Sequence, residues 1–135
     1  MHELLTPGTK VILREALKQN RKTGYDLIGV FYNGQMVSVD SRVPNKLVLE
    51  ALKNRDIEEL SEYNIIKPEY GYGHTRFDFF LANEQESCLL EVKSSTLVKD
   101  GVAMFPDAET ERGRRHVTDL AKAKKEGYRA CVLFI

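Results

Sequence analysis

The sequence predicts a mixed α/β fold, in which a small β unit precedes an α/β layer. Near the amino terminus two apolar runs flank Asn33-Gly34, the strongest short signal for a β-hairpin. Near the carboxyl end a charged helical segment leads through Gly127 into a continuous apolar run. A helix that continues into an apolar strand in this way is typical of an α/β layer.

The first predicted unit is a partial β unit over residues 1–40. Residues 11–13 follow a Pro7-Gly8 turn signal, and residues 27–32 and 36–39 form the arms of the Asn33-Gly34 hairpin. Two or three strands do not close a barrel, so we expect these strands to belong to a larger β structure.

A helical connector is predicted over residues 41–60. Asn45 is placed to cap the helix, because its side-chain oxygen can accept a backbone N–H of the first turn. Apolar residues then recur at helical spacing, and residues 58–60 suggest a short additional turn. These apolar residues are Leu47, Val48, Ala51 and Leu52.

The third predicted part, residues 61–135, is the α/β domain. Residues 76–81 and 88–93 are apolar runs joined by a polar segment, as in an antiparallel hairpin, and a second hairpin is predicted around Asp100-Gly101. A helix over residues 109–125 ends near Gly127, and residues 128–135 read as a buried strand. Because the chain stops within that apolar run, we expect this domain to be incomplete at its carboxyl end.

Composition limits the classes of partner. Of the 135 residues, 20 are Lys or Arg and 20 are Asp or Glu, so any nucleic-acid site must be a local patch. Cys88 and Cys131 lie in apolar runs and are expected to be buried, free thiols. The absence of a signal-peptide pattern and of an apolar run near 20 residues predicts a cytoplasmic protein with no membrane partner. The oligomeric state is left open.

The residues that suggest catalysis lie on the two central strands. Asp78 stands within an apolar strand, where a carboxylate is costly unless it is paired or binds a metal. Strand alternation places Glu91 and Lys93 on one face of the next strand, and pairing of the strands would bring Asp78 beside Glu91. Two carboxylates with the Val92 carbonyl form a hard oxygen site that suits Mg²⁺ or Mn²⁺. The alternative is a structural salt bridge between Lys93 and one of the two acids.

Longer motifs accompany these residues. They are Arg76-Phe77-Asp78-Phe79, Leu90-Glu91-Val92-Lys93-Ser94, Phe105-Pro106-Asp107-Ala108 and Thr110-Glu111-Arg112-Gly113. From about residue 67 to its end, the sequence resembles the sugar fermentation stimulation protein A (SfsA) family. The Phe-Pro-Asp-Ala and Thr-Glu-Arg-Gly elements make the resemblance specific.

The resemblance implies an amino-terminal OB-like domain that binds DNA, followed by a domain similar to the PD-(D/E)XK nuclease fold. It places the two acids and the lysine of that fold on Asp78, Glu91 and Lys93, with Phe77 where the motif has proline. Members of the family are longer at both ends, so the chain is expected to be truncated and its OB-like unit incomplete.

Other residues are candidates for contacts with DNA. Arg112, Arg115 and His116 open the last helix, where arginines and a helix N-terminus favour phosphate, although a solvated charged face is the alternative. On the β unit, Tyr32 is the aromatic residue expected to be exposed for base stacking, whereas Phe31 is expected in the core. Glu69 is either a further acidic ligand or, more simply, a surface residue.

Together these features predict a DNA-binding protein that hydrolyses phosphodiester bonds with Mg²⁺ or Mn²⁺ at Asp78, Glu91 and Lys93. One alternative is a DNA-binding transcriptional regulator of sugar metabolism that keeps the nuclease scaffold without catalysis. Another is a protein-interaction module with no nucleic-acid role, which would show no salt-dependent binding to DNA.

Overall fold

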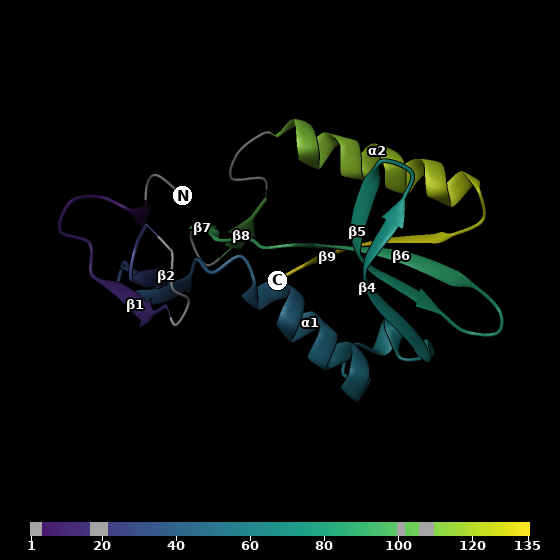
Figure 1. Ribbon diagram of the computed structural model, residues 1–135, viewed down its shortest axis with the longest axis horizontal. Helices are drawn as coiled ribbons and strands as arrows, with labels where there is room; N and C mark the ends of the chain where they lie inside the picture. Colours follow the sequence, from purple (N-terminus) through teal and green to yellow (C-terminus); the bar gives the residue numbers. More distant parts are fainter. Residues whose placement is uncertain (1–3, 17–21, 100–101, 106–109) are drawn as a thin grey trace. The chain divides into compact units, whose positions relative to one another are not determined.

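The computed structural model describes residues 4–16, 22–99, 102–105 and 110–135 (Figure 1). Contacts divide the chain into two compact units: Met1–Val43 with Ser95–Asp107, and Pro44–Ser94 with Ala108–Ile135. The strands are β1 (Val11–Glu15), β2 (Tyr25–Tyr32), β3 (Gln35–Ser38), β4 (Ile65–Tyr72), β5 (Thr75–Ala82), β6 (Ser87–Lys93), β7 (Leu97–Lys99), β8 (Val102–Met104) and β9 (Arg129–Phe134). The helices are α1 (Val43–Asn54), the short 3₁₀ helix η2 (Glu58–Leu60) and α2 (Glu111–Lys125).

The first unit contains an antiparallel meander in which β2 pairs with both β1 and β3. Asn33 and Gly34 have φ values of 50° and 78°, the left-handed pair that a tight hairpin turn requires, so the predicted hairpin is confirmed. The β7–β8 hairpin is also present, while its turn residues Asp100 and Gly101 lie outside the described residues. Phe31, expected in the core, is instead 36% exposed, and Lys10 Nζ lies 4.9 Å from its ring centroid.

Asp40, just after β3, is the centre of an ionic network in the first unit. Arg42 Nε donates to Asp40 Oδ1 at 2.7 Å, and Arg14 of β1 reaches Oδ2 at 3.1 Å. The Asp40 side chain is only 5% exposed. Hydrogen bonds from Arg42, helped by its charge and by Arg14, hold the pKa of Asp40 well below its usual range.

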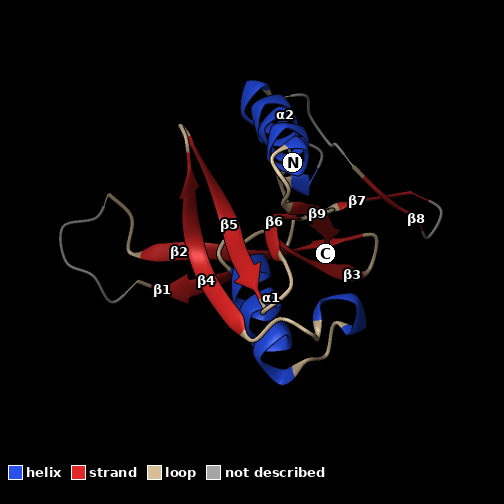
Figure 2. Cartoon of the chain, turned by 90° about the vertical axis from the view of Figure 1, so that its right-hand side faces the viewer, coloured by secondary structure: helices blue, strands red, loops and turns tan. Residues whose placement is uncertain are grey.

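The second unit is built on a four-stranded sheet in the order β4-β5-β6-β9. The β4–β5 pair forms a long hairpin (Figure 2), and β6 pairs antiparallel to β5 and parallel to β9. Helices α1 and α2 lie on opposite faces of this sheet (Figure 1). Each helix therefore has its own apolar core, one around Phe79, Leu81 and Leu90 and the other around Phe77 and Leu89.

The helix predicted as part of a connector contributes to the first of these cores. Val48 and Leu52 of α1 are buried there, so α1 from Pro44 onward belongs to the second unit. The predicted capping role of Asn45 is wrong, because α1 begins at Val43 and Asn45 lies inside its first turn. The 3₁₀ helix η2 confirms the short turn expected at residues 58–60.

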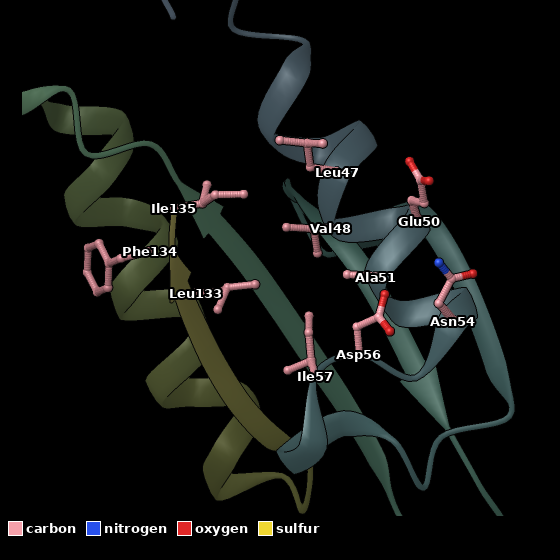
Figure 3. Close-up of a pocket in the computed structure, with 10 residues that line it drawn as sticks. All are labelled: Leu47, Val48, Glu50, Ala51, Asn54, Asp56, Ile57, Leu133, Phe134 and Ile135. Carbon is pink, nitrogen blue, oxygen red and sulfur yellow. The ribbon is translucent and has the colours of Figure 1, made fainter. Parts of the chain in front are cut away.

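Strand β9 forms one edge of the sheet, which corrects the expectation of a buried strand. Val132 and Phe134 are 39% and 53% exposed. An apolar cavity of about 450 Å³ opens between α1 and the end of β9 (Figure 3). On its two sides it is lined mainly by Leu47, Val48 and Ala51 of α1 and by Leu133, Phe134 and Ile135.

Both cysteines are free thiols, as predicted. Cys88 of β6 is fully buried and Cys131 of β9 is half-buried. A hydrogen bond with Cys131 and burial raise the pKa of the Cys88 thiol, so Cys88 stays protonated. Among the residues that the structure describes, no helix is long and apolar enough to span a membrane.

Candidate functional site

The sheet of the second unit is irregular at the level of Asp78. Phe77 and Phe79 are two residues apart, yet they pack in different cores on opposite faces of the sheet. In a regular strand such residues share a face, so the alternation of β5 shifts at Asp78. On β4, Glu69 stands between the pairs Pro68↔Phe79 and Tyr70↔Phe77 and has a φ of 53°. Both strands therefore deform at the same level.

This deformation frees the Asp78 carboxylate to bind polar groups. Its Oδ2 accepts the backbone N–H of Val92 on β6 at 2.8 Å, just beyond the last regular pair, Phe79↔Leu90. Its Oδ1 accepts the side-chain amide of Asn45 in α1 at 2.7 Å. Asp78 thus joins β6 and α1 through one partly buried carboxylate.

Glu91 is the most deeply buried carboxylate of this part of the sheet, with only 3% of the residue exposed. Its Oε1 accepts from Lys93 Nζ and lies 2.5 Å from Nδ1 of His116. The second oxygen, Oε2, is the one buried side-chain polar atom of the described residues that has no hydrogen-bond partner. Such an atom is costly to leave unpaired, so it marks a place where a further group can bind.

Helix α2 brings His116 to Glu91. His116, Leu120 and Ala123 are buried at spacings of four and three residues, which makes one face of the helix. The same face packs on Phe77 and Leu89, and Leu89 lies two residues before Glu91 on the same side of β6. His116 also meets the Phe77 ring edge-on, with centroids 6.1 Å apart.

Polar contacts cap the start of α2 and attach its middle to the sheet. Thr110 caps its start by accepting the Gly113 N–H at 2.9 Å, and a Cβ at position 113 would meet the same hydroxyl oxygen at 2.9 Å. Glycine in the Thr-Glu-Arg-Gly motif therefore makes room for the cap. Further along, Thr75 of β5 donates to Asp119.

The other predicted site residues lie at different depths. Arg112 and Arg115 are exposed in the first two turns of α2, and Tyr32 is 39% exposed on β2 of the first unit. His116 differs from the expectation of a phosphate contact, because only 3% of it is exposed and its Nδ1 faces Glu91. Glu69 is a surface residue 3.7 Å from Arg76.

The arrangement brings Lys93 and Glu91 together as an ion pair, which was the structural alternative. Asp78 and Glu91 have different partners: one carboxylate meets α1 and the other meets α2. Within the described ranges, no three His, Cys, Asp or Glu side chains are close enough together to hold a metal ion. Any cation at this place would therefore need backbone oxygens or water beside the two carboxylates.

Two family models together match nearly the whole chain. The family model described as "Sugar fermentation stimulation protein RE domain" matches residues 42–135. The chain belongs to the SfsA family. A second model, "SfsA N-terminal OB domain", matches residues 1–39, so the resemblance also covers the amino-terminal part, and the OB assignment of residues 1–39 is confirmed.

Two curated SfsA relatives, each named "Sugar fermentation stimulation protein homolog", come from Clostridium tetani and Clostridium acetobutylicum. They are 52% and 51% identical over 134 residues, which are 98% of this chain and 58% of each relative. A solved structure, "The structure of Pyrococcus Furiosus SfsA in complex with Ca2+", matches with a TM-score of 0.87 at 30% identity. The match covers 99% of this chain and 57% of the other. The chain thus spans a little over half the length of the relatives it matches.

Two contacts of this site were not expected from the sequence. Asn45 was predicted only as a helix cap. It lies 33 residues before Asp78, so no local sequence pattern links the two residues. The burial of His116 did have a signal, because it stands four and seven residues before Leu120 and Ala123.

Proposed function

We propose that this SfsA-family chain binds DNA and hydrolyses its phosphodiester bonds with a divalent cation held by Asp78 and Glu91. The observation that carries the proposal is the buried, unpartnered Oε2 of Glu91. A buried carboxylate oxygen without a donor is a suitable ligand for a hard cation such as Mg²⁺ or Mn²⁺.

The two carboxylates offer oxygen ligands to such a cation, and backbone oxygens or water would complete its coordination. Each oxygen of Asp78 accepts one hydrogen bond, which leaves lone pairs on both. The acid, acid and lysine at Asp78, Glu91 and Lys93 also match the pattern of PD-(D/E)XK nucleases. The Pyrococcus relative, crystallised in complex with Ca²⁺, supports a divalent cation as ligand of this family.

When bound, the cation would polarise the phosphate and lower the pKa of a coordinated water. Among the protein's own groups, Lys93 would act beside the cation: its side chain is 19% exposed, against 4% for Glu91, and its ammonium donates to Glu91 Oε1. There it can orient the attacking water and stabilise negative charge that develops on the phosphate. Arg112 and Arg115 would bind the DNA backbone from the exposed start of α2.

A second candidate is a DNA-binding regulator that keeps this scaffold without turnover. It is favoured by the hydrogen bonds that both Asp78 oxygens and Glu91 Oε1 already make within the protein, and by the lack of a three-ligand cluster in the described part of the chain. In that case the acids would serve mainly to hold β5, β6 and the two helices together.

Cleavage of DNA separates the two candidates. The purified protein is incubated with supercoiled plasmid and either Mg²⁺, Mn²⁺ or EDTA, beside Asp78→Ala as a control. Nicking that needs the metal and is lost in Asp78→Ala supports the nuclease. DNA binding by the wild type without metal-dependent nicking would instead favour the regulator.

A further inference from the structure

Within the described part of the chain, only one of the two carboxylate oxygens of Glu91 has hydrogen-bond partners. Both of its donors, Lys93 and His116, meet the same oxygen, Oε1, while Oε2 is left without a donor. A free carboxylate can rotate and exchange its oxygens, so this one-sided arrangement needs a group that fixes the side chain. The two donors, Lys93 and His116, differ in how firmly each can hold the Glu91 side chain in one orientation.

His116 is the fixed donor of the two. Its side chain is 4% exposed, against 19% for Lys93, and its ring is held edge-on to Phe77. It sits on the buried face of α2 whose later residues Leu120 and Ala123 are in the core. The packing of α2 on the sheet therefore holds the imidazole beside Glu91.

We propose that His116 is a positioning residue for cation binding: it holds Glu91 Oε1 so that Oε2 remains available to a divalent cation. Nδ1 donates in this role, whether the ring is the neutral Nδ1–H tautomer or the imidazolium. The inference rests on the proposed function, since it assigns a role beside the same carboxylate. It replaces the expectation that His116 touches phosphate.

A residue that hydrogen-bonds to a metal-binding side chain and orients it affects the affinity for the metal. Loss of such a partner typically reduces affinity about 10–100-fold, because the ligand must be ordered when the metal binds. His116 fits this pattern, since it contacts Glu91 and is too deeply buried to meet a substrate. The purely structural alternative is a buried ion pair that stabilises α2 on the sheet and has no effect on metal affinity.

The test compares Mn²⁺ affinity, measured by titration calorimetry, in variants shown by circular dichroism to be folded. His116→Asn keeps a donor, because its amide nitrogen stands at the same number of bonds from Cβ as Nδ1. His116→Leu removes the donor. Leu120→Ala is the matched control, since it disturbs the same buried helix face one turn later, in the apolar core with Phe77 and Leu89, and removes no hydrogen-bond donor.

We expect His116→Leu to bind Mn²⁺ about 10–100-fold more weakly than the wild type. His116→Asn and Leu120→Ala should remain within a few-fold of the wild type. Equal affinity in His116→Leu and the wild type would overturn the proposal, and so would an equal loss in Leu120→Ala. If His116→Leu does not fold, His116→Gln takes its place, because its amide stands one bond further out, at the position of Nε2, and should rescue less than His116→Asn.

The proposed function fails in a distinguishable way. If the wild type does not bind Mn²⁺, or if Asp78→Ala and Glu91→Gln bind it as well as the wild type, both proposals are overturned. If those two variants lose binding while His116→Leu retains it, the metal site stands and only the role of His116 is refuted.

Discussion

Asn45 Nδ2 donates to Asp78 Oδ1 at 2.7 Å, so the first turn of α1 is tied to the deformed level of β5. The bond joins residues 33 positions apart, and the same carboxylate also accepts the Val92 N–H of the neighbouring strand. Three elements of the second unit, α1, β5 and β6, therefore meet at the Asp78 carboxylate. Loss of the Asn45 amide should lower the stability of the folded protein.

We predict that Asn45→Ala lowers the free energy of unfolding by about 1–2 kcal/mol. A hydrogen bond to a charged group contributes roughly 1.5–3 kcal/mol, and the better helix propensity of alanine offsets part of its loss. Urea denaturation measures the change. Asn54→Ala, the same substitution at an exposed position at the end of α1, is the matched control. An equal effect in the two variants would contradict the prediction.

For the nuclease, we predict that Lys93→Ala lowers cleavage by about 10²–10⁴-fold with little change in DNA affinity. Lys93 is one of several cations that could attract DNA, whereas its position beside Glu91 suits it to the developing charge of the reaction. Lys93→Arg should not restore activity, because its planar guanidinium is larger and does not release a proton. Plasmid nicking and fluorescence anisotropy measure the two quantities, with exposed Lys124→Ala as control. Normal cleavage by Lys93→Ala would show that the site is misassigned.

DNA affinity should depend on the start of α2. Changing Arg112 and Arg115 to alanine should weaken binding and lower the slope of log affinity against log salt by about one for each phosphate that the protein no longer neutralises. The matched control changes Lys122 and Lys124, exposed lysines near the other end of the helix. If affinity and slope stay unchanged in the arginine variant, the interface lies elsewhere, and Tyr32 of the OB unit is the next candidate.

Acid should destabilise the first unit through Asp40. Its pKa is lowered from 3.8, first by hydrogen bonds from Arg42, so the folded state binds the proton more weakly than the unfolded state. The stabilisation is therefore present above the ordinary carboxyl pKa and is lost as pH falls below it. Urea titrations from about pH 6 to about pH 2 should show a flatter dependence for Asp40→Asn than for the wild type. Asp56→Asn, at an exposed position of the second unit, should retain the steep dependence.

Elements with local signals were predicted well. The β2–β3 hairpin follows from Asn33-Gly34, whose left-handed backbone is a property of those two residues themselves. Helix α2 follows from its apolar spacing and its glycine terminator, since Gly127 has a φ of 99°. The pairing of β5 with β6 follows from two apolar runs of similar length and a short polar link.

Features that depend on position in the sheet were not predicted. An apolar run has the same pattern at a sheet edge as at its centre, so the exposure of Phe134 on β9 could not be read from residues 128–135. The shift in alternation at Asp78 lies beside the left-handed backbone of Glu69 on the neighbouring strand, whereas Asp78 was placed beside Glu91 on the assumption that two regular strands pair. By contrast, the ion pair of Lys93 with Glu91, two positions apart on one strand face, was predicted as the structural alternative to a metal site.

The two units alternate along the chain, with boundaries after residues 43, 94 and 107. A single protease cut at any of these boundaries divides at least one unit between the two fragments. Neither unit is thus a contiguous module that one truncation could isolate or one recombination event could transfer. To isolate the second unit, residues 1–43 would have to be deleted and Ser94 joined to Ala108. A gene split at a single point would therefore encode two fragments in which at least one of the two units is incomplete.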